Sequence, residues 1–240
     1  MKTIKNYLTN YRTGLRALLV FLPILFTSCL DTDDNTPQTP VSWVTIYHGA
    51  VSAPALDIFT ESRQINLTSP LQYSESFPYN QFFPGNRKLR FNTHNALNML
   101  LELPVTLTAD KIYSVFLVDG ASAMDALVTE DTWEEPTTDL SKLRFVNLSA
   151  DAGDLRFLVN GQPLAGIQAG AFKTATIFTE IPKGRHTLTV QSTAGETLVE
   201  VANVDIRGNR VYTLILRGLK ETTNENRRLS LQLSTNYIRN

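Results

Sequence analysis

The sequence predicts an all-β protein, in which a signal peptide and a short tether precede two tandem β-sandwiches. Short segments rich in β-branched and aromatic residues follow one another through the body, with turn residues between them. The body also repeats its apolar pattern at a spacing of 99 residues, as between Ala53 and Ala152. The chain begins with basic residues and a short apolar stretch, which are the first parts of a secretory signal.

Residues 1–28 are predicted to be a signal peptide. The basic stretch MKTIKNYLTNYRTGLR leads into the apolar ALLVFLPILF and then into TSC. A helix of about ten residues spans roughly 15 Å, about half of the hydrocarbon core of a bilayer. Pro23 weakens such a helix further. We therefore expect a cleaved secretory signal and no permanent transmembrane helix.

The end of this signal resembles a bacterial lipobox, in which apolar and small residues precede an invariant cysteine. Thr27, Ser28 and Cys29 fit the pattern, although the usual leucine lies one position early and Phe26 takes its place. The resemblance implies that the sulfur of Cys29 receives a lipid carrying fatty acids such as palmitate, and that cleavage makes Cys29 the first residue. The alternative is an ordinary signal peptide with an incidental cysteine.

Residues 29–41 are predicted to be a flexible acidic and proline-containing tether, because DTDDNTPQTP is polar and offers no core. Asp31, Asp33 and Asp34 resemble the acidic signal that sends some lipoproteins to the outer face of the outer membrane. The alternative is a solvated acidic linker. We reject a calcium loop here, because Thr36 stands where its sharp turn needs glycine.

The composition excludes several classes of protein. The chain has 22 basic and 23 acidic residues, and four of the basic ones precede Cys29. The mildly acidic body therefore lacks the clustered Lys and Arg that nucleic-acid binding requires. A single cysteine excludes an intramolecular disulfide and any zinc or iron–sulfur site built from several cysteines.

Residues 42–130 and 142–240 are predicted to be two copies of one domain, joined by a linker over residues 131–141. WVTIYHGAVSAPALDIF in the first copy matches KLRFVNLSADAGDLRFL in the second. Other pairs at the same spacing are Leu56 with Leu155, Gly85 with Gly184, Leu89 with Leu188 and Tyr113 with Tyr212. The register slips by one residue around residues 92 to 104, where LLEL matches LVEV at a spacing of 98.

Each copy is predicted to hold about seven short strands, a density typical of a β-sandwich. The first copy has strand patterns at VTIYH, ALDIF, KLRFN, YSVFLVD and AMDALVT, and the second at LRFVN, DLRFLVNG, HTLTVQ, VYTLILRG and RLSLQLST. Asn160–Gly161 predicts a hairpin turn, at which the first copy has Glu61–Ser62 instead. No segment of the body has a convincing helical periodicity.

These patterns resemble a known family. A strand, then A-P-x-L-D-I-F, then x-P-x-G-x-x-x-L-x-V and Y-T-L-x-L-x-G is the pattern of DUF4397, a family of bacterial domains of unknown function. Its members are often found as tandem copies on secreted or surface-anchored proteins. Residues 43 to about 130 and 142 to about 235 carry the resemblance. It implies an immunoglobulin-like or transthyretin-like sandwich, and it implies no reaction.

The sequence offers no catalytic motif, so we expect no enzyme, no cofactor and no metal. The three histidines are His48, His94 and His186, and none has a partner at metal-ligand spacing. His48 aligns with Asn147, which favours a hydrogen-bonding role in a turn. Glu134 and Glu135 are adjacent in the linker and are expected to be solvated. A Ser–His–Asp set has no fixed sequence order, but nothing here favours one.

Aromatic residues give the strongest indication of a binding site. YSESFPYNQFF holds five rings, and exposed rings are a common platform for sugars. Tyr73, Tyr79 and Phe82 align with apolar residues of the second copy, so they are predicted to lie in the core. Phe77 and Phe83 have no such counterpart and, with Trp133 in the linker, are the predicted ligand-binding rings. Packing of Trp133 between the two domains is the alternative.

We therefore expect a lipid-anchored protein of the bacterial outer membrane, possessing a non-catalytic binding or adhesion surface. The expected partners are the membrane, through the anchor, and a glycan or another envelope protein. One alternative is a structural spacer or a subunit of an envelope assembly, and a hydrolase of cell-surface polymers ranks last. The sequence leaves the ligand and the oligomeric state open.

Overall fold

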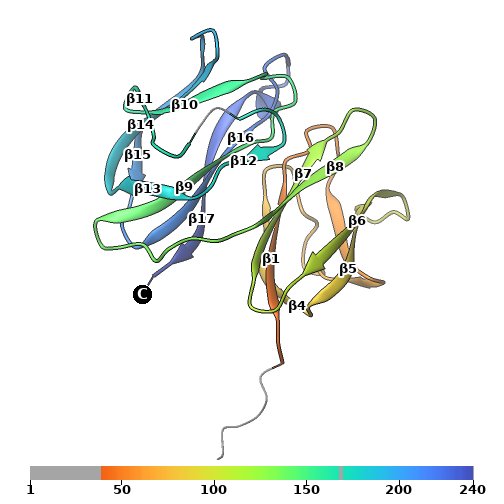
Figure 1. Ribbon diagram of the computed structural model, residues 1–240. Coiled ribbons are helices and arrows are strands. Elements are labelled where there is room, and N and C mark those ends of the chain that lie inside the picture. The colour runs from red at the N-terminus through yellow and green to blue at the C-terminus, as the bar shows by residue number, and fades with distance from the viewer. Residues whose placement is uncertain (1–38, 168–169, 240) are drawn as a thin grey trace, which may run out of the picture. The chain divides into compact units, whose positions relative to one another are not determined.

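The structure, a computed structural model, describes residues 39–167 and 170–239, and its regular secondary structure is almost entirely β-strand (Figure 1). Pro40–Asn240 form one compact unit. Within the described ranges, no helix has the length and apolar character needed to cross a membrane. The predicted signal peptide, Cys29 and nearly all of the predicted tether lie outside the described residues.

The first β-sandwich packs two four-stranded sheets against each other. One sheet has the order β4-β1-β7-β8, with strands β1 (Ser42–His48), β4 (Ser76–Phe82), β7 (Ile112–Asp119) and β8 (Met124–Glu130). The other has the order β3-β2-β5-β6, with strands β2 (Leu56–Thr60), β3 (Arg63–Gln64), β5 (Gly85–Thr93) and β6 (Met99–Leu107). Strands β1 and β7 are parallel, and the other neighbours are antiparallel.

The second β-sandwich has the same strand order. One sheet runs β12-β9-β16-β17, with β9 (Leu140–Asn147), β12 (Thr174–Ala175), β16 (Arg210–Arg217) and β17 (Ser230–Ile238), and β13 (Thr179–Pro182) also pairs with β9. The other runs β11-β10-β14-β15, with β10 (Leu155–Val159), β11 (Gln162–Pro163), β14 (Gly184–Ser192) and β15 (Thr197–Ile206). A short 3₁₀ turn, η1 (Glu225–Arg227), lies between β16 and β17. Strands β9 and β16 are parallel, as β1 and β7 are.

Each sandwich has its own apolar core, made by alternate residues of its two sheets. Leu89 and Phe91 of β5 point into the first core and are fully buried, as are Leu188 and Val190 of β14 in the second. Burial of one such side chain contributes about 1.5–3 kcal/mol. The prediction of an all-β fold is therefore confirmed, down to the period-two pattern that points these residues inward.

A third apolar cluster lies between the two sandwiches. It combines Tyr47, Phe116 and Val118 of the first sandwich with Val146, Leu148 and Ile215 of the second, all of them nearly or fully buried. These residues belong to the central strands β1, β7, β9 and β16 or directly follow them, so both faces of those strands are covered. Such coverage explains why YSVFLVD and VYTLILR read as nearly continuous apolar runs.

Strand β4 contradicts part of the prediction. Tyr73 and Tyr79 were expected in the core with Phe82, but only Phe82 is buried there. The pairing of β1 with β4 is irregular between Val44 and Ile46, which pair with Asn80 and Phe77. The one extra residue of β4 in this bulge reverses the side-chain alternation. Phe77 and Phe82 therefore both face the core, and the hydroxyl of Tyr79 reaches the second sandwich instead.

Candidate ligand-binding site

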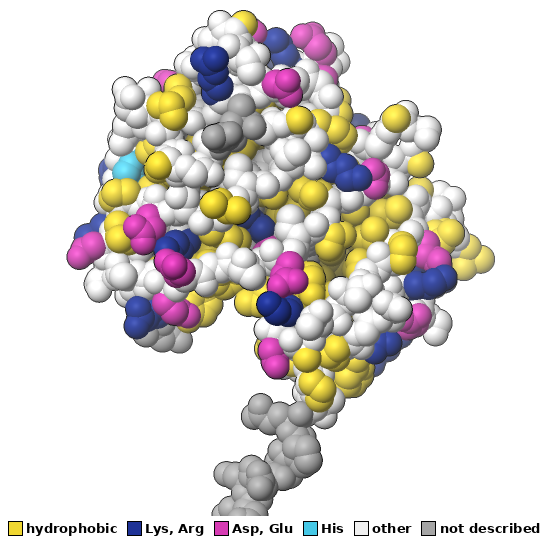
Figure 2. Space-filling view, in the orientation of Figure 1, with side chains coloured by type: hydrophobic (Ala, Val, Ile, Leu, Met, Phe, Trp, Pro, Cys, Tyr) yellow, Lys and Arg dark blue, Asp and Glu magenta, His cyan; other side chains and the backbone are white. Residues whose placement is uncertain are grey.

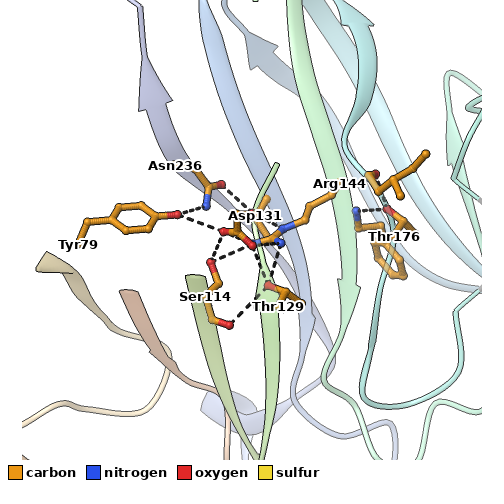
Figure 3. A network of polar contacts seen from close by, with 10 residues as sticks. Tyr79, Ser114, Thr129, Asp131, Arg144, Thr176 and Asn236 are labelled. Carbon is orange, nitrogen blue, oxygen red and sulfur yellow. Dashed lines mark hydrogen bonds and ion pairs between the residues drawn. The ribbon is translucent and has the colours of Figure 1, made fainter. Parts of the chain in front are cut away.

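A buried ion pair joins the two sandwiches (Figure 3). Arg144 of β9 is 2% exposed and Asp131, just after β8, is fully buried. The guanidinium Nη1 donates to Asp131 Oδ1 at 2.6 Å, and Nη2 donates to Oδ2 at 3.0 Å. Nη1, Nη2 and Nε also donate to the hydroxyls of Thr129, Ser114 and Thr213, at 2.9–3.0 Å. All five N–H groups of the guanidinium thus have acceptors.

The same network extends across the interface through Tyr79 and Asn236. Thr213 donates its hydroxyl hydrogen to Asn236 Oδ1 at 2.7 Å, and Asn236 Nδ2 donates to the Tyr79 hydroxyl at 2.8 Å. The Tyr79 hydroxyl is 3.4 Å from Asp131 Oδ2. Burial, and then the charge of Asp131, raise the pKa of Tyr79, so its hydroxyl stays a donor. This network links residues of both sandwiches by hydrogen bonds and an ion pair.

Rings flank the Arg144 guanidinium and lead to the surface. Its central carbon lies 5.4 Å from the ring centre of Phe116 and 4.5 Å from that of Phe178. Trp133 packs edge-on against Phe178 at 5.4 Å, and its ring centre lies 6.0 Å from that of Tyr237. Trp133 is therefore half-buried against the second sandwich, since both of its ring neighbours belong to that sandwich.

Trp133 and Phe178 also line a shallow surface depression of about 700 Å³, which we call the Trp133 depression. Its other lining residues are Thr132, Glu134, Lys142, Thr179 and Glu180. The connector between the sandwiches, residues 131–139, contributes one threonine hydroxyl and one carboxylate beside the two rings. The second sandwich contributes the same two kinds of group. Rings next to convergent hydrogen-bonding groups are the usual composition of a small-molecule site.

Lys142 holds the two carboxylates of the depression. Its Nζ lies 3.3 Å from Glu134 Oε2 and 3.2 Å from Glu180 Oε1. The lysine side chain is only 8% exposed, whereas the glutamates are 90% and 58% exposed. Burial lowers the pKa of Lys142, but the hydrogen bonds and charges of Glu180 and Glu134 outweigh it, and the pKa is raised. The lysine is therefore a fixed cation, and both carboxylates keep accessible oxygens.

A second depression, the Phe83 groove, lies at the end of the first sandwich that holds Ser42, which we call the Ser42 end. The groove has a volume of about 500 Å³. Phe83 is 64% exposed on its wall and Leu67 is 75% exposed. Its polar lining includes Glu61, Arg63, Gln64, Asn80, Gln81 and Arg87. Phe83 is thus mostly exposed, whereas the two rings of the Trp133 depression pack against each other.

The three rings predicted from the sequence do not meet. Phe83 lines the Phe83 groove and Trp133 lines the Trp133 depression, whereas Phe77 lines neither. Phe77 is half-buried and packs against the core of the first sandwich. Cys29, the predicted lipidation site, lies outside the described residues.

The histidines are tied to structural partners. His48 is fully buried and its Nε2 is 3.0 Å from the carbonyl oxygen of Pro54, which makes Nε2 the donor. His94 Nδ1 is 2.8 Å from Asp57 Oδ1, and its Nε2 is 2.8 Å from the amide nitrogen of Asn95. Both nitrogens of His94 thus have partners, whereas Nδ1 of His48 is buried without one. Among the described residues, no cluster of His, Cys, Asp and Glu has the geometry to hold a metal ion.

Several residues of these sites were not found from the sequence. Lys142, Glu180 and Phe178 meet Trp133 only because β9 pairs with β13, although strands β10 to β12 separate the two in the sequence. The position of Arg144 inside the apolar strand pattern LRFVN does indicate a buried ion pair, because a buried arginine needs an acidic or hydrogen-bonding partner. The identity of that partner could not be read, because Asp131 lies in the connector.

One comparison with known proteins gives a match. Residues 42–157 match DUF4397, a domain of unknown function. The matched stretch covers the first sandwich, the connector, strand β9 and the first part of β10. It supports the resemblance found in the sequence over this part of the chain, and the description names no activity. No curated protein matches the chain.

Proposed function

We propose that this protein is a lipid-anchored, non-catalytic binding protein of the bacterial outer membrane, and that it binds a glycan in the Trp133 depression. The anchor is supported by the order of the basic region, the apolar stretch and Thr27–Ser28–Cys29. The acidic residues that follow Cys29 support export to the outer membrane.

The observation that carries the glycan proposal is the pairing of rings with two accessible carboxylates over one buried lysine. A sugar offers an apolar face that packs on rings such as Trp133 and Phe178. Its hydroxyls donate well to carboxylates, and hydrogen bonds to charged groups are the stronger kind. Lys142 pairs with both Glu134 and Glu180, so the two carboxylates lie beside the same buried cation.

A glycan array probed with residues 40–240 tests this proposal. Glu134→Gln and Glu180→Gln should each weaken binding by about tenfold or more, since hydrogen bonds to charged groups contribute about 1.5–3 kcal/mol. Glu225→Gln is the matched control, because Glu225 is 84% exposed and lies on η1, outside the depression. The absence of any bound glycan, or equal binding by all variants, would contradict the proposal.

We propose further that the second sandwich is another copy of the same domain. Its strand order repeats that of the first, including the parallel central pair. Matching special residues support this: Tyr113 and Tyr212 each accept a backbone N–H five residues earlier, from Thr108 and Arg207. The finer type of sandwich, immunoglobulin-like or transthyretin-like, belongs to this proposal.

A structural spacer is the second candidate function. It is favoured by the buried Arg144–Asp131 pair and by the apolar cluster between the sandwiches, which join them through specific contacts. An assembly subunit would form oligomers that increase with concentration. Sedimentation of residues 40–240 as a monomer at high concentration would contradict an assembly subunit, and glycan binding would contradict a purely structural spacer.

A further inference from the structure

Two large apolar side chains project from the Ser42 end of the first sandwich. Leu67 is 75% exposed and Phe83 is 64% exposed, on the walls of the Phe83 groove. Figure 2 shows apolar side chains gathered at this end of the first sandwich. Apolar side chains that gather on an exposed surface with a polar rim are characteristic of interaction sites.

The chain enters the body beside this surface. Ser42 begins β1 and pairs with Phe82, the residue before Phe83. Trp43 is 39% exposed and pairs with Gln81, which lines the groove. Cys29 precedes Ser42 by thirteen residues, so the two are at most about 45 Å apart in any conformation. A lipid on Cys29 therefore keeps the Ser42 end closer to the bilayer than the opposite end, on average.

The charge and rigidity of the groove also suit a membrane surface. Arg63 and Arg87 line it together with one acidic residue, Glu61. Arg87 Nε donates to the carbonyl oxygen of Phe83 at 2.8 Å, and Nη2 donates to that of Pro84 at 2.6 Å. The loop that carries Phe83 is thereby fixed before any contact forms. Cations beside exposed leucine and aromatic side chains are typical of surfaces that lie in the headgroup region.

We propose that the Ser42 end rests on the lipid bilayer, with Leu67 and Phe83 inserted among the headgroups and Arg63 against lipid phosphates. This contact presupposes the proposed anchor on Cys29. Two side chains bind a membrane weakly by themselves, but the anchor makes the contact intramolecular and raises its effective concentration. The contact fixes the direction of the body relative to the bilayer.

The mature chain from Cys29 tests this contact without depending on lipidation in cells. Its only thiol is coupled to a maleimide lipid in phosphatidylethanolamine–phosphatidylglycerol vesicles whose acyl chains are brominated. Leu67→Trp and Leu97→Trp are compared with the parent chain. Leu97 is the matched control, since it is 99% exposed at the β5–β6 turn, at the opposite end of the same sandwich. The fluorescence added by Leu67→Trp should shift to the blue and be quenched, and that added by Leu97→Trp should not.

Equal quenching at the two positions, or none at position 67, would overturn the membrane contact. A soluble oligosaccharide that shifts the Leu67→Trp emission without vesicles would also overturn it, in favour of a glycan in the Phe83 groove. Failure of the anchor is seen separately, as absence of lipid on Cys29 in cells, and it leaves the vesicle result readable.

Discussion

Arg144 and Asp131 form the most deeply buried ion pair of the described residues. Such a pair costs desolvation energy when the protein folds, so it adds little net stability by itself. Removing one partner is different, because the remaining charge is left buried without compensation. The residues around Arg144 supply hydroxyls and ring faces, and none of them supplies a second acid.

Asp131→Asn should therefore lower the free energy of unfolding of residues 40–240 by about 3–5 kcal/mol. Asp139→Asn is the control, because Asp139 pairs with Lys183 at the surface and is 78% exposed. This control should cost less than about 1 kcal/mol. Urea unfolding followed by circular dichroism measures both, and similar small losses would contradict a structural role for the buried pair.

His48 gives a pH-dependent prediction. Burial lowers its pKa below the ordinary 6.5, although Pro54, Asp119 and Glu75 oppose this, and its Nδ1 has no hydrogen-bond partner. The unfolded chain therefore binds a proton at His48 more readily than the folded chain does, so stability falls as pH falls below about 6.5.

In His48→Asn, the residue that the second sandwich has at the equivalent Asn147, this contribution disappears. The free energy of unfolding of the wild type minus that of the variant should thus decrease between about pH 7.5 and about pH 5. Urea unfolding at several pH values measures the difference. A difference that stays constant, or rises toward acid, would show that His48 is not buried in its neutral form.

At the level of the elements, the hairpin turn after β2 and its counterpart after β10 place different residues in the left-handed region. Glu61 has a φ of 53°, and its counterpart Asn160 has a φ of 51°. Asparagine tolerates this left-handed region better than glutamate does. Asn160 Oδ1 also accepts the N–H of Thr187 at 2.9 Å, whereas Glu61 Oε1 is 3.4 Å from the equivalent N–H of Lys88.

Glu61→Asn should therefore stabilise the protein by up to about 1 kcal/mol. The reverse change, Asn160→Glu, should destabilise it, because it adds strain and removes the bond to Thr187. Thermal unfolding of both variants measures the effects. Destabilisation by Glu61→Asn would mean that this turn is not limited by its left-handed residue.

Most elements could be predicted from the sequence, because strand patterns and the 99-residue register are local properties. The one-residue slip has a structural cause. The turn from Gln191 to Thr197 is one residue shorter than that from Asn92 to Met99. An extra residue in β15, between Val201 and Val204, restores the register. The bulge in β4 could not be predicted, because it depends on pairing with β1, and it misplaced Tyr79.

At the scale of the whole body, a third apolar cluster joins the two sandwiches, and it could not be predicted from the sequence. Strands β7 and β16 are apolar on both faces, and the pattern alone does not say what covers the outer face. Gly49 illustrates how close the contact is, since a Cβ there would lie 2.7 Å from Leu148 of the second sandwich. Both surface depressions are lined by elements that are distant in the sequence. Phe83 and Trp133 could therefore be recognised as candidate rings, but the residues around them could not be predicted.

The sandwiches should therefore unfold together. Val118→Asp places a charge in the cluster between them, where an unpaired charge is costly, while both cores stay intact. Calorimetry should show one transition for residues 40–240 and two, at lower temperature, for the variant. Val128→Asp is the control on the neighbouring strand, because Val128 is 38% exposed. A single unshifted transition in Val118→Asp would mean that the cluster does not couple the sandwiches.

The anchor is the claim on which location and membrane contact both depend, and labelled palmitate tests it most directly. Bacteria expressing the full chain are grown with the label, and the protein is recovered and compared with Cys29→Ser. The account predicts label on the wild type and none on Cys29→Ser. An unlabelled wild type, or equal labelling of both, would contradict it.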